Sequence, residues 1–159
     1  MRVGIGYDVH PLASGRRLVL GGVDIPFNKG LSGWSDADVL THAIIDALLG
    51  AAALGDIGSH FPPGEPQYKG IASLTLLKRV GDELAENSWQ IVNVDATIVA
   101  EQPKLRDFID AMRQQLSETL GINISQVSVK ASTSAGLGFV GRGEGMAAYA
   151  IAMLEGSQG

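Results

Sequence analysis

The chain of 159 residues contains no cysteine. This absence excludes disulfide bonds and zinc sites built on thiolates, and it removes any redox signal about the compartment. Long hydrophobic runs are missing too: segment 43–54 contains Asp46, whereas a membrane-spanning helix needs about 20 apolar residues. The N-terminus also lacks the apolar stretch of a signal peptide. We therefore expect a cytoplasmic protein that does not bind to a membrane.

Positive charge is scarce as well. The chain has 12 Lys and Arg against 17 Asp and Glu, a formal net charge of −5, and charged residues make up only 18%. The acidic balance argues against nucleic-acid binding, because such binding requires a basic surface. Hydrophobic residues reach 45% and the mean hydropathy is +0.16. These values predict one globular domain over residues 1–159, with part of its surface covered by other subunits.

Hydrophobic periodicity predicts strands and helices in alternation. Strands are expected over 2–10, 89–100 and 124–131, and a hairpin with a Gly-Gly turn is expected over 18–27. The expected helices are 35–54, capped by Ser35 or Asp36, then 73–87, and 104–120 opened by Pro103. Loops are expected over 28–34, 56–70 and 137–145, and the apolar segment 147–154 fits either a strand or a helix. This order predicts an α+β fold, a two-layer sandwich with helices on one face of a mixed β-sheet.

Asp8, His10 and His42 form the first candidate site. Residues two apart on a strand face the same side, so Asp8 and His10 point together. One carboxylate with two imidazoles is a common open zinc set that leaves a position for substrate. The alternatives are a hydrogen-bonded pair at a strand end and a histidine that belongs to the core. Asp46, one turn after His42, either orients that ring or is an ordinary surface acid.

Two further segments could contact a phosphorylated ligand. Residues 33–36 could bind an anion at the start of a helix, with help from the Ser35 hydroxyl, or could form only an N-cap. In segment 55–65, Asp56 could reach a sugar-like hydroxyl group, or could bond to its own backbone in a turn.

The glycine-rich segment 131–145 is the fourth candidate. Its hydroxyls, Ser132 and Thr133, stand at a strand end, and glycines allow the backbone to approach phosphate closely. Arg142 could bind phosphate through two parallel hydrogen bonds. The alternative is a flexible turn with an ion pair between Arg142 and Glu144.

Together these segments resemble one family over nearly the whole chain, the 2-C-methyl-D-erythritol 2,4-cyclodiphosphate synthases of the non-mevalonate isoprenoid pathway. The motifs fall in the family's order with nearly its spacing. The matching stretches are 2–10, 35–39, His42, 46–58, 61–62, 69–70, 93–95, 103–104 and 137–145.

The resemblance implies a homotrimer with active sites between adjacent subunits. Such an enzyme, a cyclising phosphorus–oxygen lyase, converts 4-diphosphocytidyl-2-C-methyl-D-erythritol 2-phosphate to the 2,4-cyclodiphosphate and releases CMP. It implies Zn²⁺ on Asp8, His10 and His42, and Mg²⁺ or Mn²⁺ bridging the substrate diphosphate. It also leaves open an isoprenoid diphosphate as a ligand of the central cavity.

The resemblance further assigns roles to residues. Contacts to the diphosphate and the erythritol group are implied for Ser35, Asp56, Ile57, Gly58, Phe61, Pro62, Pro63, Gly64, Glu65, Phe139 and Arg142. The implied cytidine pocket consists of Ala100, Glu101, Gln102, Pro103, Lys104, Leu105, Arg106, Ala131, Ser132 and Thr133. The implied catalytic residues are Thr133, Trp34 and Asp56.

Three positions depart from the common family pattern. Trp34 stands where a histidine with a transition-state role is usual, Pro63 replaces an aspartate, and Ala135 replaces the glutamate that binds the second metal. Mg²⁺ is then expected to be held by substrate phosphates and water.

The chemistry itself suits an acidic chain. In-line attack of the 2-phosphate on the β-phosphorus needs no general base, because the nucleophile is already ionised. A protein with few cationic side chains must import positive charge as metal ions to hold such a polyanion. The rival interpretations are a carrier of metal or isoprenoid diphosphate without turnover, and a purely structural trimer.

Overall fold

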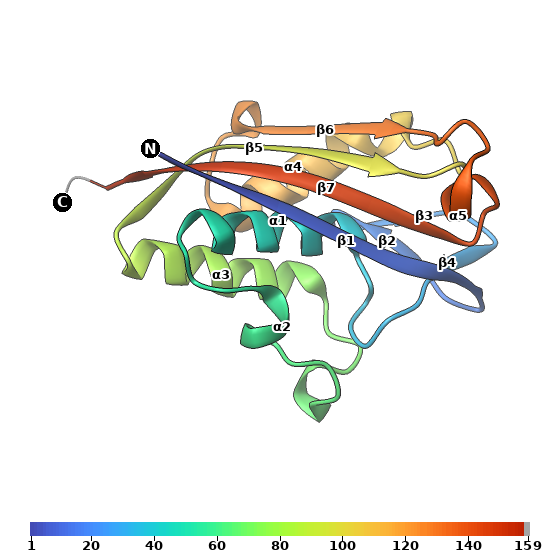
Figure 1. Cartoon of the computed structure of the whole chain (residues 1–159), viewed down its shortest axis with the longest axis horizontal. Helices are drawn as coiled ribbons and strands as arrows, with labels where there is room; N and C mark the ends of the chain where they lie inside the picture. Colours follow the sequence, from blue (N-terminus) through green and yellow to red (C-terminus); the bar gives the residue numbers. More distant parts are fainter. Residues whose placement is uncertain (158–159) are drawn as a thin grey trace.

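The computed structural model describes residues 1–157, which form a layer of β-sheet packed on a layer of helices (Figure 1). The main sheet has the order β4-β1-β7-β5-β6. Its strands are β1 (Arg2–Ser14), β4 (Lys29–Leu31), β5 (Trp89–Val99), β6 (Val127–Ser132) and β7 (Gly145–Gly156). Strands β5 and β6 run parallel, while the other pairs are antiparallel. The predicted α+β fold with a mixed sheet is therefore confirmed.

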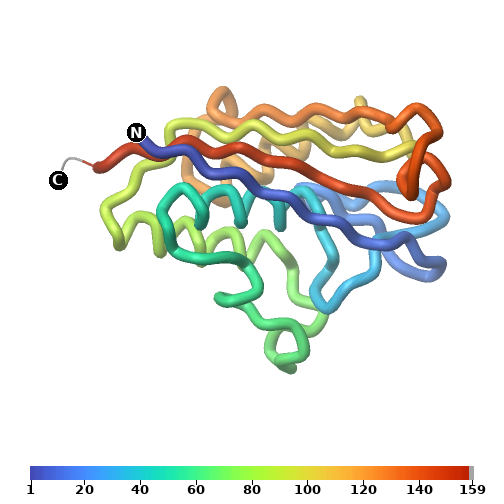
Figure 2. The backbone as a smooth tube through the Cα atoms, in the orientation of Figure 1, coloured from blue at the N-terminus to red at the C-terminus, as the bar shows by residue number. Residues whose placement is uncertain are grey.

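Three helices cover one face of this sheet: α1 (Val39–Ala51), α3 (Ser73–Glu86) and α4 (Ile109–Leu120) (Figure 1). Two short helices, α2 (Ile57–His60) and α5 (Gly138–Gly141), lie in connecting segments. The hairpin of β2 (Leu18–Leu20) and β3 (Val23–Ile25) has the predicted Gly-Gly turn, with positive φ at both glycines. Figure 2 shows the start of β1 beside the end of β7, as their antiparallel register requires. Among the described residues, no helix is both long and apolar enough to cross a membrane.

Helix α1 is the centre of the core, because nearly all of its residues are buried. It lies directly under β1, where two glycines allow the backbones to touch. A Cβ atom added at Gly6 would lie 1.8 Å from the carbonyl oxygen of Ala43, and one at Gly4 would lie 2.0 Å from that of Ala47. This close approach brings the next residues of β1 within reach of side chains on α1.

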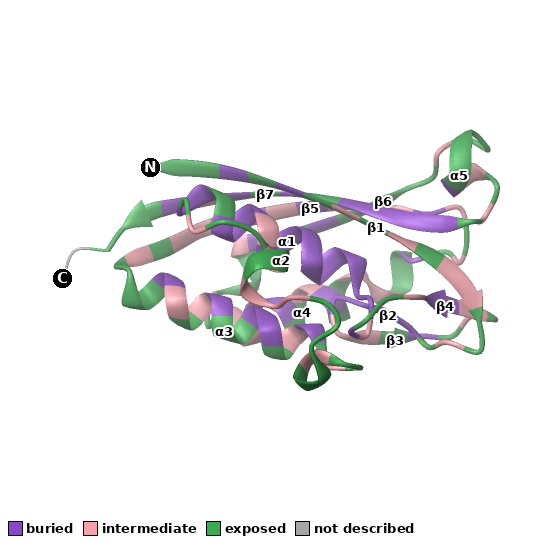
Figure 3. Cartoon of the chain, turned by 60° about the horizontal axis from the view of Figure 1, so that its bottom comes forward, coloured by how far each residue is buried: buried purple, intermediate pink, exposed green. Residues whose placement is uncertain are grey.

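The part of the opposite face that β1 and β7 form carries exposed apolar side chains, and the chain's own helices do not cover it (Figure 3). We call this surface the apolar stripe; its members are Val3, Ile5, Tyr7 and Val9 of β1 and Tyr149 and Ile151 of β7. Their exposed fractions lie between 41% and 72%. Exposed apolar side chains gathered on neighbouring strands are typical of a surface that another protein covers.

The first helix begins later than predicted. It starts at Val39, not at Ser35 or Asp36, because Asp38 is the N-cap and its carboxylate accepts a hydrogen bond from the Thr41 amide. The helix also ends early, at Ala51, since Ala53 adopts a left-handed φ of 56°. Asp38 also accepts hydrogen bonds from the hairpin turn. Nothing in the sequence around Asp38 indicates this long-range contact.

The third helix begins at Ile109, so the predicted start at Lys104 was wrong. The buried side chain of Leu105 anchors the preceding turn in the core, and a 3₁₀ turn over Arg106–Phe108 follows before the helix begins.

Three predicted loops contain regular structure. Segment 28–34 includes β4, because β1 continues past His10 to Ser14 and pairs with it. Segment 56–70 includes α2, and segment 137–145 includes α5. The ambiguous segment 147–154 is a strand, part of β7, and β6 starts at Val127 after a 3₁₀ turn.

Candidate active site

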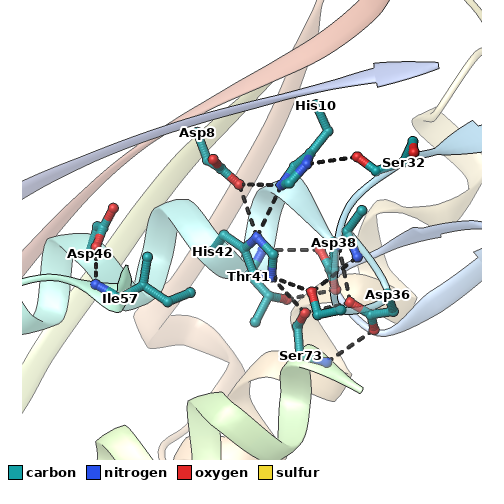
Figure 4. A network of polar contacts seen from close by, with 12 residues as sticks. Asp8, His10, Ser32, Asp36, Asp38, Thr41, His42, Asp46, Ile57 and Ser73 are labelled. Carbon is teal, nitrogen blue, oxygen red and sulfur yellow. Dashed lines mark hydrogen bonds and ion pairs between the residues drawn. The ribbon is translucent and has the colours of Figure 1, made fainter. Parts of the chain in front are cut away.

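Asp8, His10 and His42 converge on one point between β1 and α1 (Figure 4). The Oδ2 atom of Asp8 lies 2.8 Å from Nε2 of His10 and 2.9 Å from Nδ1 of His42. The two ring nitrogens are 3.2 Å apart. The structure thus brings together the three residues that the sequence pattern singled out, and His42 is not merely a core histidine.

The hydrogen bonds around the two rings indicate which nitrogen carries the proton. Nδ1 of His10 lies 3.0 Å from the carbonyl oxygen of Ser32, which can only accept, so the lone pair of this ring is on Nε2. Nε2 of His42 lies 2.8 Å from Oγ of Ser73, and that hydroxyl donates its own proton to Asp36. Nε2 of His42 therefore donates, and its lone pair is on Nδ1.

In this protonation state the Asp8 oxygen and one nitrogen of each ring face one another with their lone pairs, and no proton lies between them. Burial raises the pKa of Asp8, but the His10 and His42 rings, which donate to this carboxylate whenever their inner nitrogens carry a proton, outweigh burial and lower the pKa to about 2. The carboxylate is therefore ionised at neutral pH. One anionic oxygen and two neutral imidazole nitrogens are the donors that a divalent metal ion such as zinc prefers. The residues fit a divalent metal.

A cavity of about 200 Å³ opens beside this cluster. It is lined by the three candidate ligands together with Trp34, Ser35, Ile57, Gly58, Phe61, Pro63, Tyr68 and Leu76. We call it the metal cavity. Five of these lining residues were assigned to substrate from the sequence and Trp34 was assigned to catalysis, whereas Tyr68 and Leu76 were missed because such a residue in a loop or helix carries no distinctive signal. Pro62, Gly64 and Glu65 lie on the same loop but do not line the cavity.

Trp34 connects two walls of the metal cavity. Its indole nitrogen donates a hydrogen bond of 2.9 Å to the carbonyl oxygen of Glu65. Its own carbonyl accepts a hydrogen bond of 2.8 Å from the amide of Gly70, and the Lys69 ammonium lies 5.9 Å from the ring centre. Trp34 thus holds the second half of this loop, from Glu65 to Gly70.

Asp46 does not orient His42 as expected. Its carboxylate instead accepts a hydrogen bond of 2.8 Å from the amide of Ile57 and so holds the start of α2. The groups that contact Nε2 of His42 are the hydroxyls of Ser73 and, at 3.2 Å, of Ser35. The contact of Ser73 with His42 was not predicted, because the sequence indicates only that Ser73 starts a helix.

Asp56 caps α2, in agreement with the simpler of the two interpretations. Its Oδ1 atom accepts hydrogen bonds from the Ser59 amide at 2.8 Å and the Ser59 hydroxyl at 2.6 Å. These bonds lower the pKa of the Asp56 carboxyl. A contact between Asp56 and an erythritol hydroxyl stays a prediction.

The expected anion site at residues 33–36 is not at the start of a helix. Helix α1 begins at Val39, and the negative carboxylate of Asp38 already occupies its N-terminus. The amide of Asp36 is also satisfied, by the carbonyl oxygen of Ile71. Ser35 nevertheless lines the metal cavity, so its hydroxyl stays close to the metal ligands.

A second cavity, of about 560 Å³, lies where the parallel strands β5 and β6 end. All residues assigned to the cytidine pocket except Gln102 line it, together with Asp107 and Ile109. We call it the strand-end cavity. Glu101 supports this rim, because its carboxylate accepts a hydrogen bond of 2.6 Å from the Ser134 amide. Within residues 1–157 the two cavities share no lining residue.

Phe139 and Arg142 line neither of these two cavities. Arg142 instead forms the ion pair that was weighed as the alternative, with its Nε atom 3.0 Å from a carboxylate oxygen of Glu144. In a single chain these two residues therefore do not join the rest of the candidate site.

Comparisons with known proteins identify the family of this chain. The model of the YgbB family matches residues 1–155. A protein of Dehalococcoides mccartyi (strain CBDB1) named 2-C-methyl-D-erythritol 2,4-cyclodiphosphate synthase is 64% identical over 155 residues, which cover 98% of this chain and 99% of that protein. A protein of the same name from Alkaliphilus metalliredigens is 59% identical over 159 residues, the whole of both chains.

Two solved structures extend the comparison. The IspF protein of Plasmodium falciparum, in a complex with CDP, is 31% identical with a TM-score of 0.87 and covers 99% of this chain and 97% of its own. The bifunctional IspDF protein of Campylobacter jejuni is 41% identical with a TM-score of 0.94, and the match covers 98% of this chain but 42% of that protein.

Proposed function

The chain belongs to the YgbB family, and from this membership we propose how its residues perform the family's reaction. The protein is an isoprenoid-pathway enzyme that cyclises 4-diphosphocytidyl-2-C-methyl-D-erythritol 2-phosphate to 2-C-methyl-D-erythritol 2,4-cyclodiphosphate. The observation that carries the site assignment is the convergence of three lone-pair donors in a cavity lined by the expected substrate residues. Purified protein should release CMP from this substrate only in the presence of a divalent metal.

The reaction is that of a cyclising phosphorus–oxygen lyase. An oxygen of the 2-phosphate forms a bond to the β-phosphorus, the bond from that phosphorus to the oxygen shared with the α-phosphorus breaks, and CMP leaves with this oxygen. No proton has to move, because the attacking phosphate is already ionised. Positioning and charge neutralisation therefore account for most of the barrier.

Asp8, His10 and His42 would hold Zn²⁺, which supplies positive charge to the substrate phosphates when bound. The walls of the metal cavity hold the erythritol part against this centre, and the apolar side chains of Ile57, Phe61 and Leu76 exclude water from it. Ser35 would contact the diphosphate. A second metal, Mg²⁺ or Mn²⁺, would rest on the substrate phosphates and water, because position 135 is alanine.

The complete site would need two copies of the chain. The metal cavity and the strand-end cavity are separate, which suits a site whose metal half and cytidine half come from adjacent subunits. The apolar stripe supplies a surface for that association, and its exposure favours a homotrimer with the sheets around a central axis. In such an assembly Phe139, Arg142 and Thr133 could join a neighbouring metal cavity, and an isoprenoid diphosphate could occupy the centre.

Mixed assemblies test the shared site. His42→Ala removes the metal half, and Ser132→Trp fills the strand-end cavity, so each variant alone should be inactive. Co-expressed in equal amounts, they should regain about one quarter of wild-type CMP release, because each mixed trimer restores one site out of three. If both halves belonged to one chain, mixing would restore nothing.

Trp34 is expected to act by holding the loop over the metal cavity. Trp34→Phe keeps the ring but removes the donor to the Glu65 carbonyl, a hydrogen bond worth about 1 kcal/mol. We expect KM to rise about fivefold with little change in kcat, and faster hydrogen exchange at the amides of residues 64–69. A fall in kcat with unchanged KM would instead assign Trp34 a role in the transition state, and Trp34→His provides the comparison with the usual family residue.

A further inference from the structure

We propose that Ser73 and Asp36 are positioning residues for the metal: they hold His42 in the one tautomer that presents Nδ1 to the ion. This inference rests on the metal site of the proposed function. It concerns the chain of hydrogen bonds on the side of the His42 ring that faces away from Asp8 and His10 (Figure 4).

The chain of hydrogen bonds begins at Asp36. One oxygen of its carboxylate accepts the proton of the Ser73 hydroxyl, and the other accepts a hydrogen bond of 3.0 Å from the Ser73 amide. With its proton directed at Asp36, the Ser73 oxygen presents only lone pairs to Nε2 of His42, 2.8 Å away. The anion at one end therefore places the His42 proton on Nε2 and the lone pair on Nδ1.

Burial makes this arrangement stringent. Ser73 is fully buried, and His42 is 8% exposed, so water cannot easily replace a lost partner. Without the Ser73 oxygen, Nε2 would keep Ser35 as its neighbour at 3.2 Å, but that hydroxyl also accepts a hydrogen bond from the Ala37 amide. The competing tautomer would point a proton from Nδ1 at the metal position, which excludes coordination there.

The three residues come from three different parts of the fold. Asp36 precedes α1, His42 lies on α1, and Ser73 is the first residue of α3, directly after the segment that covers the metal cavity. The position of the Ser73 hydroxyl therefore depends on how α3 packs against the segment around α1. A small displacement of α3 would change its hydrogen bond to His42.

Metal affinity is the direct test. Ser73→Ala should weaken Zn²⁺ binding by about 10- to 100-fold, the range found when partners of ligating histidines are removed, as measured by competition with a chromophoric chelator in the absence of substrate. Asp36→Asn, which keeps one acceptor for the hydroxyl, should cause a smaller loss. The visible absorption bands of the Co²⁺-substituted protein should shift in both variants.

Ser117→Ala is the matched control. Ser117, like Ser73, is a buried serine in a helix, but its hydroxyl donates to a backbone carbonyl that is far in sequence from the metal ligands. It should leave the affinity and the Co²⁺ bands unchanged. Wild-type Zn²⁺ affinity and unchanged Co²⁺ bands in a folded Ser73→Ala protein would overturn the inference. If that variant does not fold, the same two measurements on Asp36→Asn and Ser73→Thr decide. The bands should shift in Asp36→Asn and stay as in the wild type in Ser73→Thr. Zn²⁺ binding without CMP release in the wild type would contradict the proposed function but not this inference.

Discussion

His42→Ala is expected to lose bound metal and CMP release together. The remaining ligands, Asp8 and His10, supply one oxygen and one nitrogen, and two donors rarely retain zinc where three or four are the rule. The rate should fall by roughly 10³-fold or more, which corresponds to about 4 kcal/mol of transition-state stabilisation. Metal content by elemental analysis and CMP release by chromatography measure the two effects on the same preparation.

His60→Ala is the natural control for this variant. The chain has three histidines, and His60 lies on α2, where one ring nitrogen bonds to the carbonyl oxygen of Leu54 and the other lies 3.3 Å from Glu83. Its removal should leave the metal content at the wild-type level. A His42→Ala protein that kept both metal and turnover would refute the site, whereas a wild-type protein that bound metal and a prenyl diphosphate but released no CMP would support the carrier interpretation.

Gly6→Ala is expected to cause a large loss of stability. The added Cβ would lie 1.8 Å from the carbonyl oxygen of Ala43 and 2.8 Å from the amide nitrogen of Ala47. Ordinary overpacking costs about 1–3 kcal/mol because side chains rotate away, but here the obstacle is the backbone of α1. We expect the free energy of unfolding to fall by more than about 4 kcal/mol, measured by urea denaturation at fixed protein concentration.

Gly50→Ala, which lies in α1, should raise the free energy of unfolding instead of lowering it. A Cβ at Gly50 has the carbonyl oxygen of Ile5 as its neighbour at an ordinary 3.9 Å. Because alanine is a better helix former than glycine, stability should rise by up to about 1 kcal/mol. A Gly6→Ala protein of near wild-type stability would mean that α1 does not rest on β1 as described.

Local patterns were sufficient for much of the fold. The alternation of residues 2–10 and the Gly-Gly turn predicted β1 and the hairpin, since both depend on neighbours in sequence. The predicted starts of α1 and α4 were wrong, because a long-range role of one side chain near each start overrides local propensity. Asp38 caps α1 and also holds the amide of Gly21. The buried Leu105 fixes the turn before α4 in the core.

The donor set of the candidate metal site could be predicted from the sequence. Asp8 and His10 share a strand face because side chains alternate along any strand, and the motifs that resemble the family carried His42, the cavity walls and the cytidine residues. Tertiary structure alone decided how these parts act. It brought His42 to the strand through the Gly6 contact, placed Ser73 rather than Asp46 behind the ring, and separated the two cavities. The physical reason is that a hydrogen bond between residues 31 or 37 positions apart depends on how the helices pack on the sheet, and no local spacing encodes that packing.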